Sequence, residues 1–169
     1  MNCLLLGGNE NVGKTETIIR LHKYLANFIN AAPQPQQQHK TLQGVPINDY
    51  MWILEGQNKE NKNIRIIINT AADDKNSIMS FKNFFDKNFG LAGYDILISA
   101  VRDKDTEESP SKRHLFFNTM NINPFFNFIL EIPFGKVRKG KKSPIAKKWY
   151  ADQIDNLIHH TLANPPFNI

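Results

Sequence analysis

Apolar residues along this chain follow two spacings, and together they predict strands that alternate with helices. Apolar runs typical of strands covered on both faces occur at 3–6, 64–68 and 94–101. Apolar residues at the spacing of one helix face predict amphipathic helices at 18–29, 78–89 and 149–162. Because strands and helices alternate, we expect an α/β fold: a three-layer sandwich with a mostly parallel sheet and helices on both faces.

Further segments complete the expected order of elements. Two apolar runs, 50–54 and 64–68, flank a polar stretch and predict an antiparallel hairpin. A short helix at 115–120 and a last strand at 126–132 should follow. The Pro- and Gln-rich segment 33–38 offers nothing to a core, so we expect a mobile loop there. At 169 residues with no internal repeat, the chain predicts a single domain over 1–169.

A motif follows the first apolar run, because Gly8 to Thr15 fit the pattern G-x-x-x-x-G-K-[ST]. These residues lie where the first strand turns into the first helix, which is the context that the motif requires. Glycines let backbone N–H groups point at a bound phosphate, and the helix that begins near Gly13 adds the positive end of its dipole. Lys14 can reach the β- and γ-phosphates of a nucleotide, and the Thr15 hydroxyl can bind Mg²⁺.

With this motif in its expected context, the chain resembles the P-loop NTPase superfamily. The resemblance implies the P-loop NTPase fold, a nucleotide-binding domain over the whole chain, and ATP or GTP with Mg²⁺ as the bound groups. The residues that it implies for nucleotide binding are Gly8, Asn9, Glu10, Asn11, Val12, Gly13, Lys14, Thr15 and Glu16. Lys14 is also a candidate catalytic residue.

A cation bound to Thr15 needs further oxygen ligands, and these should come from the end of a second strand. The strand 64–68 is followed by Asn69, and Asp73 and Asp74 come a few residues later. We therefore predict a metal site formed by Thr15, Asn69 and Asp73. The two aspartates are equally suited to capping the helix that begins nearby.

Functional residues of such sheets lie beyond the carboxyl ends of the strands, which directs attention to the charged segment 102–113. Arg102 directly follows an expected buried strand, and its planar guanidinium could stabilise the charge that develops on a γ-phosphate. Arg102 is therefore the second candidate catalytic residue, and Lys112 and Arg113 are candidate lid residues. The alternative is a solvated, charge-balanced loop with no part in catalysis.

Two partial resemblances point to different branches of the superfamily. The segment Ile68-Asn69-Thr70-Ala71-Ala72-Asp73-Asp74 and the order of elements before it are similar to the front half of small Ras-like GTPases, with Asn69 and Ala72 in place of an Asp and a Gly. The segment from Gly7 to Thr15 is similar to the phosphate loop of dethiobiotin synthetase and its relatives. After the last strand, Glu131-Ile132-Pro133-Phe134 stands where the guanine-reading motif N-K-x-D would be expected, and this favours adenine or loose base selectivity.

The formal net charge of +5 comes from one segment of the chain. Seven basic residues and no acidic one lie between Lys136 and Lys148, and without them 14 basic residues face 16 acidic ones, a net charge of −2. This segment could contact the phosphates of a nucleotide, a phosphorylated substrate or a nucleic acid. Because Trp149 also suits the apolar face of the last helix, we expect no nucleic-acid partner.

Two features indicate the compartment. The first apolar run ends at Gly7 and is too short for a signal peptide or a membrane span, so we expect a cytoplasmic protein without a membrane partner. The single cysteine, Cys3, lies inside the first expected strand, so neither an intrachain disulfide nor a cysteine metal cluster is expected.

These features predict an ATPase or a small-molecule kinase that acts on the γ-phosphate of a nucleoside triphosphate, with a small-molecule phosphoryl acceptor in the second case. The alternative is a nucleotide-operated switch, a degenerate relative of the small GTPases, in which the long connection 30–50 changes shape with the bound phosphate. Asp49, near the end of this connection, could act as a general base or be an ordinary turn residue.

Overall fold

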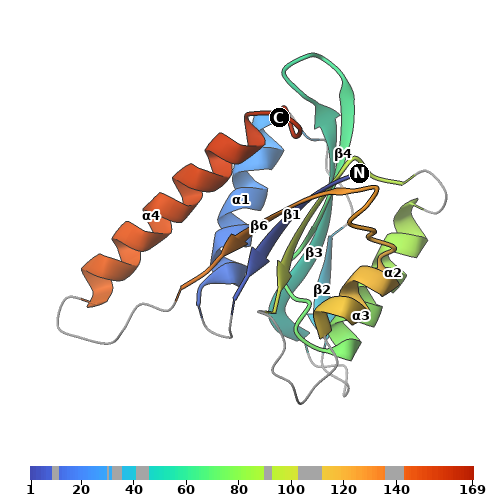
Figure 1. Ribbon diagram of the computed structural model, residues 1–169, viewed down its shortest axis with the longest axis horizontal. Coiled ribbons are helices and arrows are strands. Elements are labelled where there is room, and N and C mark those ends of the chain that lie inside the picture. Colours follow the sequence, from blue (N-terminus) through green and yellow to red (C-terminus); the bar gives the residue numbers. More distant parts are fainter. Residues whose placement is uncertain are drawn as a thin grey trace.

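The computed structural model describes residues 1–8, 12–29, 31, 36–40, 46–89, 93–102, 112–135 and 143–169. Within these ranges, strands and helices follow one another as Figure 1 shows. The strands are β1 (Asn2–Gly7), β2 (Gln36–Lys40), β3 (Pro46–Gln57), β4 (Asn63–Asn69), β5 (Ile96–Val101) and β6 (Phe128–Pro133). The helices are α1 (Lys14–Phe28), α2 (Lys75–Phe89), α3 (Lys112–Thr119) and α4 (Ser143–Leu162).

These strands form one mixed sheet in the order β2-β3-β4-β5-β1-β6. Strand β1 runs parallel to β5 and β6, and β4 runs parallel to β5, whereas the pairs β2–β3 and β3–β4 are antiparallel. The prediction of a mostly parallel sheet in a P-loop NTPase fold is therefore wrong. Three adjacent strands are joined by antiparallel ladders, and β5 separates β4 from the strand that leads into the glycine-rich motif.

The antiparallel part follows from short connections, since a strand can return beside its predecessor through a few residues while a parallel neighbour needs a long crossover. Between β3 and β4 the chain reverses direction within a few polar residues. The N–H of Asn58 donates to the carbonyl O of Lys62 at 2.9 Å, and the N–H of Lys62 donates to Oδ1 of Asn58. Asn61 adopts a φ of 57°, in the left-handed region that asparagine tolerates. The predicted hairpin is thus confirmed.

Strand β2 corrects the interpretation of the Gln-rich segment. The mobile loop expected over 33–38 is wrong for Gln36 to Gln38, which pair with Trp52, Met51 and Tyr50 of β3. Backbone pairing does not depend on an apolar side chain, and β2 is an edge strand, where Gln36 and Gln37 remain exposed. Residues 33–35 lie outside the described ranges.

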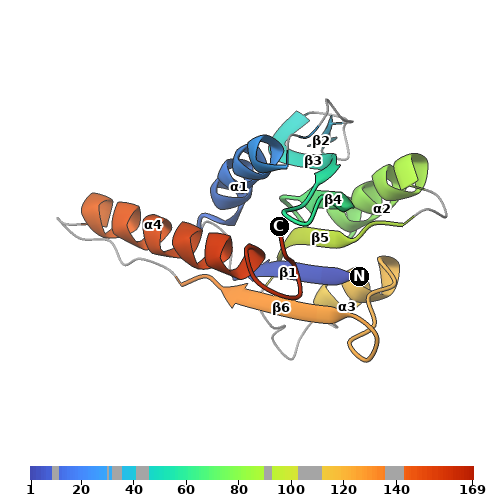
Figure 2. The same cartoon turned by 90° about the horizontal axis from the view of Figure 1, so that it is seen from above.

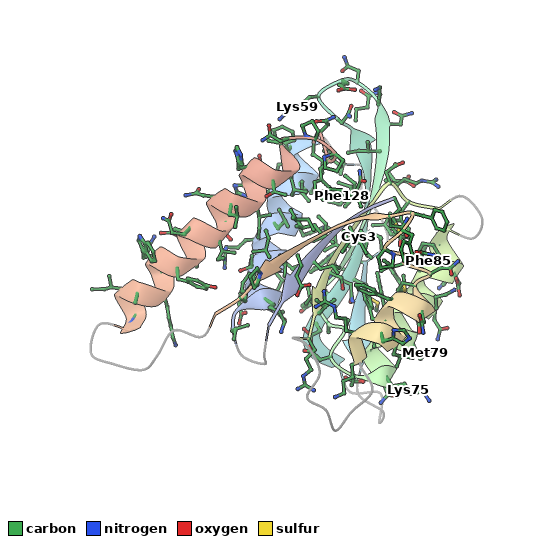
Figure 3. All side chains as sticks on the ribbon, viewed as in Figure 1. Cys3, Lys59, Lys75, Met79, Phe85 and Phe128 are labelled. Atoms are coloured by element: carbon green, nitrogen blue, oxygen red, sulfur yellow. The ribbon has the colours of Figure 1, made fainter. Side chains whose placement is uncertain are left out.

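Helices cover both faces of the sheet, with α1 and α4 on one side and α2 and α3 on the other (Figures 1 and 2). Along β1, Leu4 and Leu6 belong to the core that includes α1 and α4, while Cys3 and Leu5 belong to the core that includes α2 and α3. Figure 3 shows Cys3 within the body of the protein and Phe85 on α2. Both faces of the central strands are therefore buried, which explains their continuous apolar runs.

Helix α4 buries a narrower face than its sequence pattern predicts. Ile154, Ile158 and Leu162 are buried, but Trp149, placed on the same face by its spacing, is 63% exposed. Five positions separate Trp149 from Ile154, a rotation of about 140° around the helix axis, so the two side chains point in different directions. No helix within the described ranges is both long and apolar enough to cross a lipid bilayer.

Candidate functional site

The helices that connect the strands change from one face of the sheet to the other beside β1. Helix α1 follows β1 on one face, whereas α2 and α3, which follow the strands β4 and β5, cover the other face (Figure 2). Ligands of α/β sheets bind outside the carboxyl ends of strands at such a topological switch point. In this protein the switch point lies between β1 and β5, beside the segment 8–15.

The register of β1 and β5 brings Arg102 to this point. Gly7 lies opposite Val101 in the parallel ladder, so the next residues of the two strands are Gly8 and Arg102. Arg102 is half-buried. The tertiary structure therefore places this candidate catalytic residue beside the first glycine of the motif.

Two glycines hold the described ends of the motif in conformations that other residues rarely adopt. Gly8 has a φ of 153°, and a Cβ there would lie 3.0 Å from the carbonyl O of Phe134 and 3.1 Å from Cγ2 of Val12. Gly13 has a φ of 95° and is the N-cap of α1, where no side chain caps the first N–H groups. Such N–H groups favour an anion. Three predicted nucleotide-binding residues lie outside the described ranges: Asn9, Glu10 and Asn11.

Lys14 supplies a buried positive charge at the start of α1. Its side chain folds back across the motif, and its Nζ donates a hydrogen bond to the carbonyl O of Gly8 at 2.5 Å. Burial raises the pKa of the Asp73 carboxyl group, and the charge of Lys14 acts against that rise. The neighbouring Glu16 is exposed. The ammonium group thus lies where the motif predicts the phosphates, with an anionic side chain within its electrostatic reach.

Thr15, the predicted magnesium ligand, contacts a carboxylate. Its Oγ1 donates to Oδ1 of Asp49 at 3.1 Å, and Oγ1 of Thr70 donates to the same oxygen, also at 3.1 Å. Oγ1 of Thr70 in turn accepts from the N–H of Tyr50 at 2.8 Å, and the N–H of Thr70 donates to the carbonyl O of Tyr50 at 3.0 Å. Thr70 therefore extends the β3–β4 ladder by one step and holds Asp49 against α1.

Asp73 is a second carboxylate near this cluster. Its burial raises the pKa of the carboxyl group; the charge of Lys14 lowers it, and the charge of Asp49 raises it again. The Oδ1 atom of Asp73 is buried, and no group among the described residues donates a hydrogen bond to it. A buried carboxylate oxygen without a donor is costly unless a cation or a further donor reaches it.

The structure separates the roles of three polar residues at and after the end of β4. Asp74 caps α2, because its Oδ1 accepts from the N–H groups of Asn76 and Ser77 at 2.7 and 3.1 Å. Asn69 is fully buried, and its Nδ2 donates to the carbonyl O of Ala71 and to Oγ of Ser99. The amide of Asn69 thus braces the end of β4 against β5, and of the two aspartates that follow β4 it is Asp74 that caps α2.

The two candidate lid residues at the start of α3 also differ. Arg113 forms a two-pronged ion pair with Glu131 of β6, with Nη1 donating to Oε1 at 2.9 Å, and its guanidinium lies 5.5 Å from the ring centroid of Phe117. Burial raises the pKa of Asp73, and the positive charge of Lys112 makes a small contribution against that rise. In the described arrangement Arg113 therefore braces β6, while Lys112 acts electrostatically on the candidate site.

The residues present fit a hard divalent cation such as Mg²⁺, which prefers oxygen ligands. Thr15 offers a hydroxyl, Asp49 a carboxylate that this hydroxyl already contacts, and Asp73 a buried oxygen without a donor. Among the described residues, no group of three or more His, Cys, Asp or Glu side chains could hold a metal ion. A cation here would take its remaining ligands from phosphate oxygens or water, as magnesium does in nucleotide sites.

Asp49 and Thr70 are the members of this cluster that sequence reasoning did not assign to a cation. Asp49 was considered only as a general base or a turn residue. The hairpin itself carries a signal, because continuing its register beyond Met51↔Asn69 places Tyr50 opposite Thr70, at the carboxyl end of β4. What no local pattern shows is that this end of the hairpin lies against the first turn of α1.

Comparison with known proteins leaves this geometry as the basis for interpretation. No protein-family model, no curated protein and no solved structure matches the chain.

Proposed function

We propose that the chain binds a nucleoside triphosphate together with Mg²⁺, with its phosphates on the segment Gly8–Thr15. The observation that carries this proposal is the contact between Thr15 and Asp49 beside the buried Lys14. Lys14 offers a positive charge for phosphate oxygens, and the next residue, Thr15, offers with Asp49 of β3 oxygen ligands for a cation. A glycine turn that merely joined a strand to a helix would need neither group.

In this proposal the side chains of the site divide between phosphate contacts and cation contacts. Lys14 would exchange its bond to the Gly8 carbonyl for bonds to phosphate oxygens, and the uncapped N–H groups of α1 would donate hydrogen bonds to the same anion. Thr15, Asp49 and Asp73 would hold Mg²⁺, whose charge offsets that of the phosphates when it is bound. Arg102 would direct its guanidinium toward the γ-phosphate from the neighbouring strand end.

The reaction we propose is ATP hydrolysis, or transfer of the γ-phosphoryl group to a small acceptor, in the cytoplasm where ATP and Mg²⁺ are supplied. Lys14 and Arg102 would stabilise the charge that spreads over the γ-phosphate oxygens as the bond to the leaving group breaks. ATP is preferred to GTP in this proposal because Glu131 to Phe134 carry no guanine-reading motif.

One observation favours a nucleotide-operated switch as the second candidate. Asp49 is joined to Thr15 by a hydrogen bond, so the end of the connection 30–50 touches the proposed cation site directly. Binding of Mg²⁺ would change the partners of Asp49 and thereby bias the segment that precedes it.

Calorimetric titration with ATP and Mg²⁺ tests the phosphate site. Lys14→Ala should weaken binding at least tenfold, since a buried charge-assisted contact contributes about 1.5–3 kcal/mol. Lys23→Ala, which removes an exposed lysine from the same helix, is the matched control and should bind as the parent does. Equal affinity of the Lys14 variant and the parent would refute the proposal.

Phosphate release distinguishes the two candidate functions. Turnover that depends on an added small acceptor supports a kinase, and steady release without an acceptor supports an ATPase. Slow release together with nucleotide-dependent protease sensitivity between residues 30 and 50 supports the switch.

A further inference from the structure

A buried polar pair joins two neighbouring strands beside the candidate site. Asn69 ends β4 and lies opposite Ser99 of β5 in the parallel ladder, and neither residue is exposed to solvent. Strand β5 in turn pairs with β1, which leads into the glycine-rich motif, and Figure 2 shows the three strands side by side. The pair therefore links the strand that leads to Asp73 with the strand next to β1.

The side-chain amide of Asn69 holds the backbone on its way to Asp73. Nδ2 of Asn69 donates to the carbonyl O of Ala71 at 2.7 Å, and Oδ1 of Asn69 accepts from the N–H of Ala71 at 3.3 Å. One side chain thus binds both backbone polar groups of a residue that lies two positions before Asp73. Thr70, between them, is held by β3, because its N–H donates to the carbonyl O of Tyr50. The turn 69–71 is therefore fixed from two sides.

Ser99 anchors this amide to the neighbouring strand. Nδ2 of Asn69 also donates to Oγ of Ser99 at 3.1 Å, and Oγ of Ser99 donates its own proton to the carbonyl O of Ala100 at 2.9 Å. The Ser99 hydroxyl therefore acts as an acceptor toward Asn69. Because these groups are buried, losing one of the bonds leaves a partner without water to replace it.

This bonding pattern requires an amide at position 69. An amide donates through its nitrogen and accepts through its oxygen, and Asn69 uses both functions on Ala71. An ionised carboxylate only accepts, so an aspartate here would face the Ala71 carbonyl O without a proton to share and would bury a charge. With its oxygen directed at the Ala71 N–H, Asn69 is better suited to holding the turn than to binding a cation.

Asp73 is the candidate ligand that this turn carries. Its Oδ1 is buried and receives no hydrogen bond from the described residues, and the charges of Lys14 and Asp49 both act on its carboxyl group. A buried carboxylate oxygen without a donor gains by turning toward water. A fixed backbone opposes that movement and keeps the carboxylate within reach of the candidate site.

We propose that Asn69 is a positioning residue: its amide, anchored by Ser99, holds the turn before Asp73 so that the Asp73 carboxylate meets a cation bound at Thr15 and Asp49. This inference rests on the proposed binding of ATP with Mg²⁺ and adds the residue that aligns one of the ligands. Asn69 itself touches neither the cation nor the phosphates. An asparagine therefore suits the position at which the resemblance to small GTPases implies an aspartate.

Asn69→Asp separates positioning from ligation, because the two side chains have nearly the same shape. If Asn69 bound the cation, the added charge would strengthen binding of ATP with Mg²⁺. If Asn69 positions Asp73, that affinity should fall about tenfold or more, as is usual when a partner of a metal ligand is lost. Calorimetric titration of the full-length chain measures it, and affinity for ATP alone should stay within about twofold of the parent. Equal or tighter binding with Mg²⁺ would overturn the proposal.

Two further variants separate positioning from a loss of stability. Ser99→Ala removes the anchor of the amide and should weaken binding of ATP with Mg²⁺ about threefold, the effect of one hydrogen bond. Ile66→Val is the control, because it removes a methyl group from a fully buried residue of the same strand, away from its carboxyl end. It should be destabilised in urea and bind as the parent does. An equal loss of affinity in both variants would assign the effect to stability and overturn the proposal.

Hydrogen exchange at the Ala71 amide reports on the same arrangement without any ligand. Asn69→Ala removes the acceptor of this N–H, so its exchange should be about tenfold faster or more than in the parent. Unchanged exchange would show that Asn69 does not hold the turn. A parent whose affinity for ATP does not respond to Mg²⁺ would refute the proposed cation site and this inference with it. A parent that responds, with an Asn69→Asp variant that responds equally, would refute the positioning role alone.

Discussion

Thr70 provides the most informative test of the candidate site, because one hydroxyl group connects the fold to the proposed cation ligands. It is almost fully buried, donates to Oδ1 of Asp49 and accepts from the N–H of Tyr50. Thr70→Val keeps the shape of the side chain and removes both hydrogen bonds. It therefore changes the position of Asp49 without touching Asp49, Thr15 or Lys14.

The magnitude follows from the two bonds that are lost. A hydrogen bond to a carboxylate contributes about 1.5–3 kcal/mol, and a buried N–H left without an acceptor costs about 1–3 kcal/mol. Asp49 and Tyr50 are only half-buried, so water recovers part of both terms. We expect Thr70→Val to lower the free energy of unfolding by about 2 kcal/mol. Thr70→Ser keeps the hydroxyl and loses one methyl group, a cost of about 0.8 kcal/mol.

Two assays separate stability from function. Urea unfolding measures the loss of stability, and calorimetry with ATP in the presence and absence of Mg²⁺ measures the cation-dependent part of binding. Thr70→Val should lose about 10- to 30-fold in affinity for ATP with Mg²⁺ but little for ATP alone, since only the cation ligands are disturbed. Thr70→Ser should bind as the parent does.

Two outcomes would contradict the assigned roles of Thr70 and Asp49. If Thr70→Val is as stable as Thr70→Ser, the hydrogen bonds do not hold the end of the hairpin. If Thr70→Val is destabilised but binds ATP with Mg²⁺ as tightly as the parent, the network exists and Asp49 is no cation ligand.

Three further predictions concern the rest of the fold. Gly7→Ala would place a Cβ 2.0 Å from Oε1 of Glu131 and push that carboxylate away from Arg113, costing about 2 kcal/mol in urea unfolding; an equal cost in a Glu131→Ala background would contradict this cause. Burial lowers the pKa of His22 below its ordinary value of 6.5, so the imidazole binds a proton more readily in the unfolded chain than in the folded protein. The stability that comes from burying the neutral imidazole is therefore complete above pH 6.5 and is lost as the pH falls through the lowered pKa. His22→Phe should flatten the pH dependence of the melting temperature in that acidic range, and an unchanged slope would show that other groups cause it. Burial raises the pKa of the Cys3 thiol to about 12, so a disulfide reagent at neutral pH should label Cys3 only in urea, and labelling of the native protein would show that the first strand opens.

The local part of the structure was predictable because it depends on near neighbours in the chain. The glycine motif between Cys3–Leu6 and the first helix, and the hairpin around Asn58–Lys62, rest on apolar spacing and turn-forming residues. The choice of Lys14, Thr15 and Arg102 as candidate residues followed from the same signals, because each directly follows a strand or begins a helix. Their proposed roles stay predictions that the binding experiments test.

Long-range register decided the features that were mispredicted or missed. Gln36–Gln38 form an edge strand because β3 has backbone groups there that need a pairing partner. No pattern within residues 36–38 indicates that such a partner strand lies nearby. Trp149 fits a helical spacing, but only the packing of α4 shows that its side chain is mostly exposed among the described residues. The glutamines suit a loop or an edge strand, and Trp149 suits a buried or an exposed helix face. Contacts between segments that are distant in the sequence decide between these alternatives.

The sequence by itself thus determined that a glycine-rich motif joins a strand to a helix, since backbone freedom at Gly8 and Gly13 and the periodicity around them are local properties. Only the tertiary structure decided what surrounds the motif. The mixed strand order places Arg102 beside Gly8, turns the amide of Asn69 toward Ser99, and brings Asp49 to Thr15. The physical reason is that the side chains of the candidate site come from segments far apart in the chain, and sheet order and register fix the distances between them.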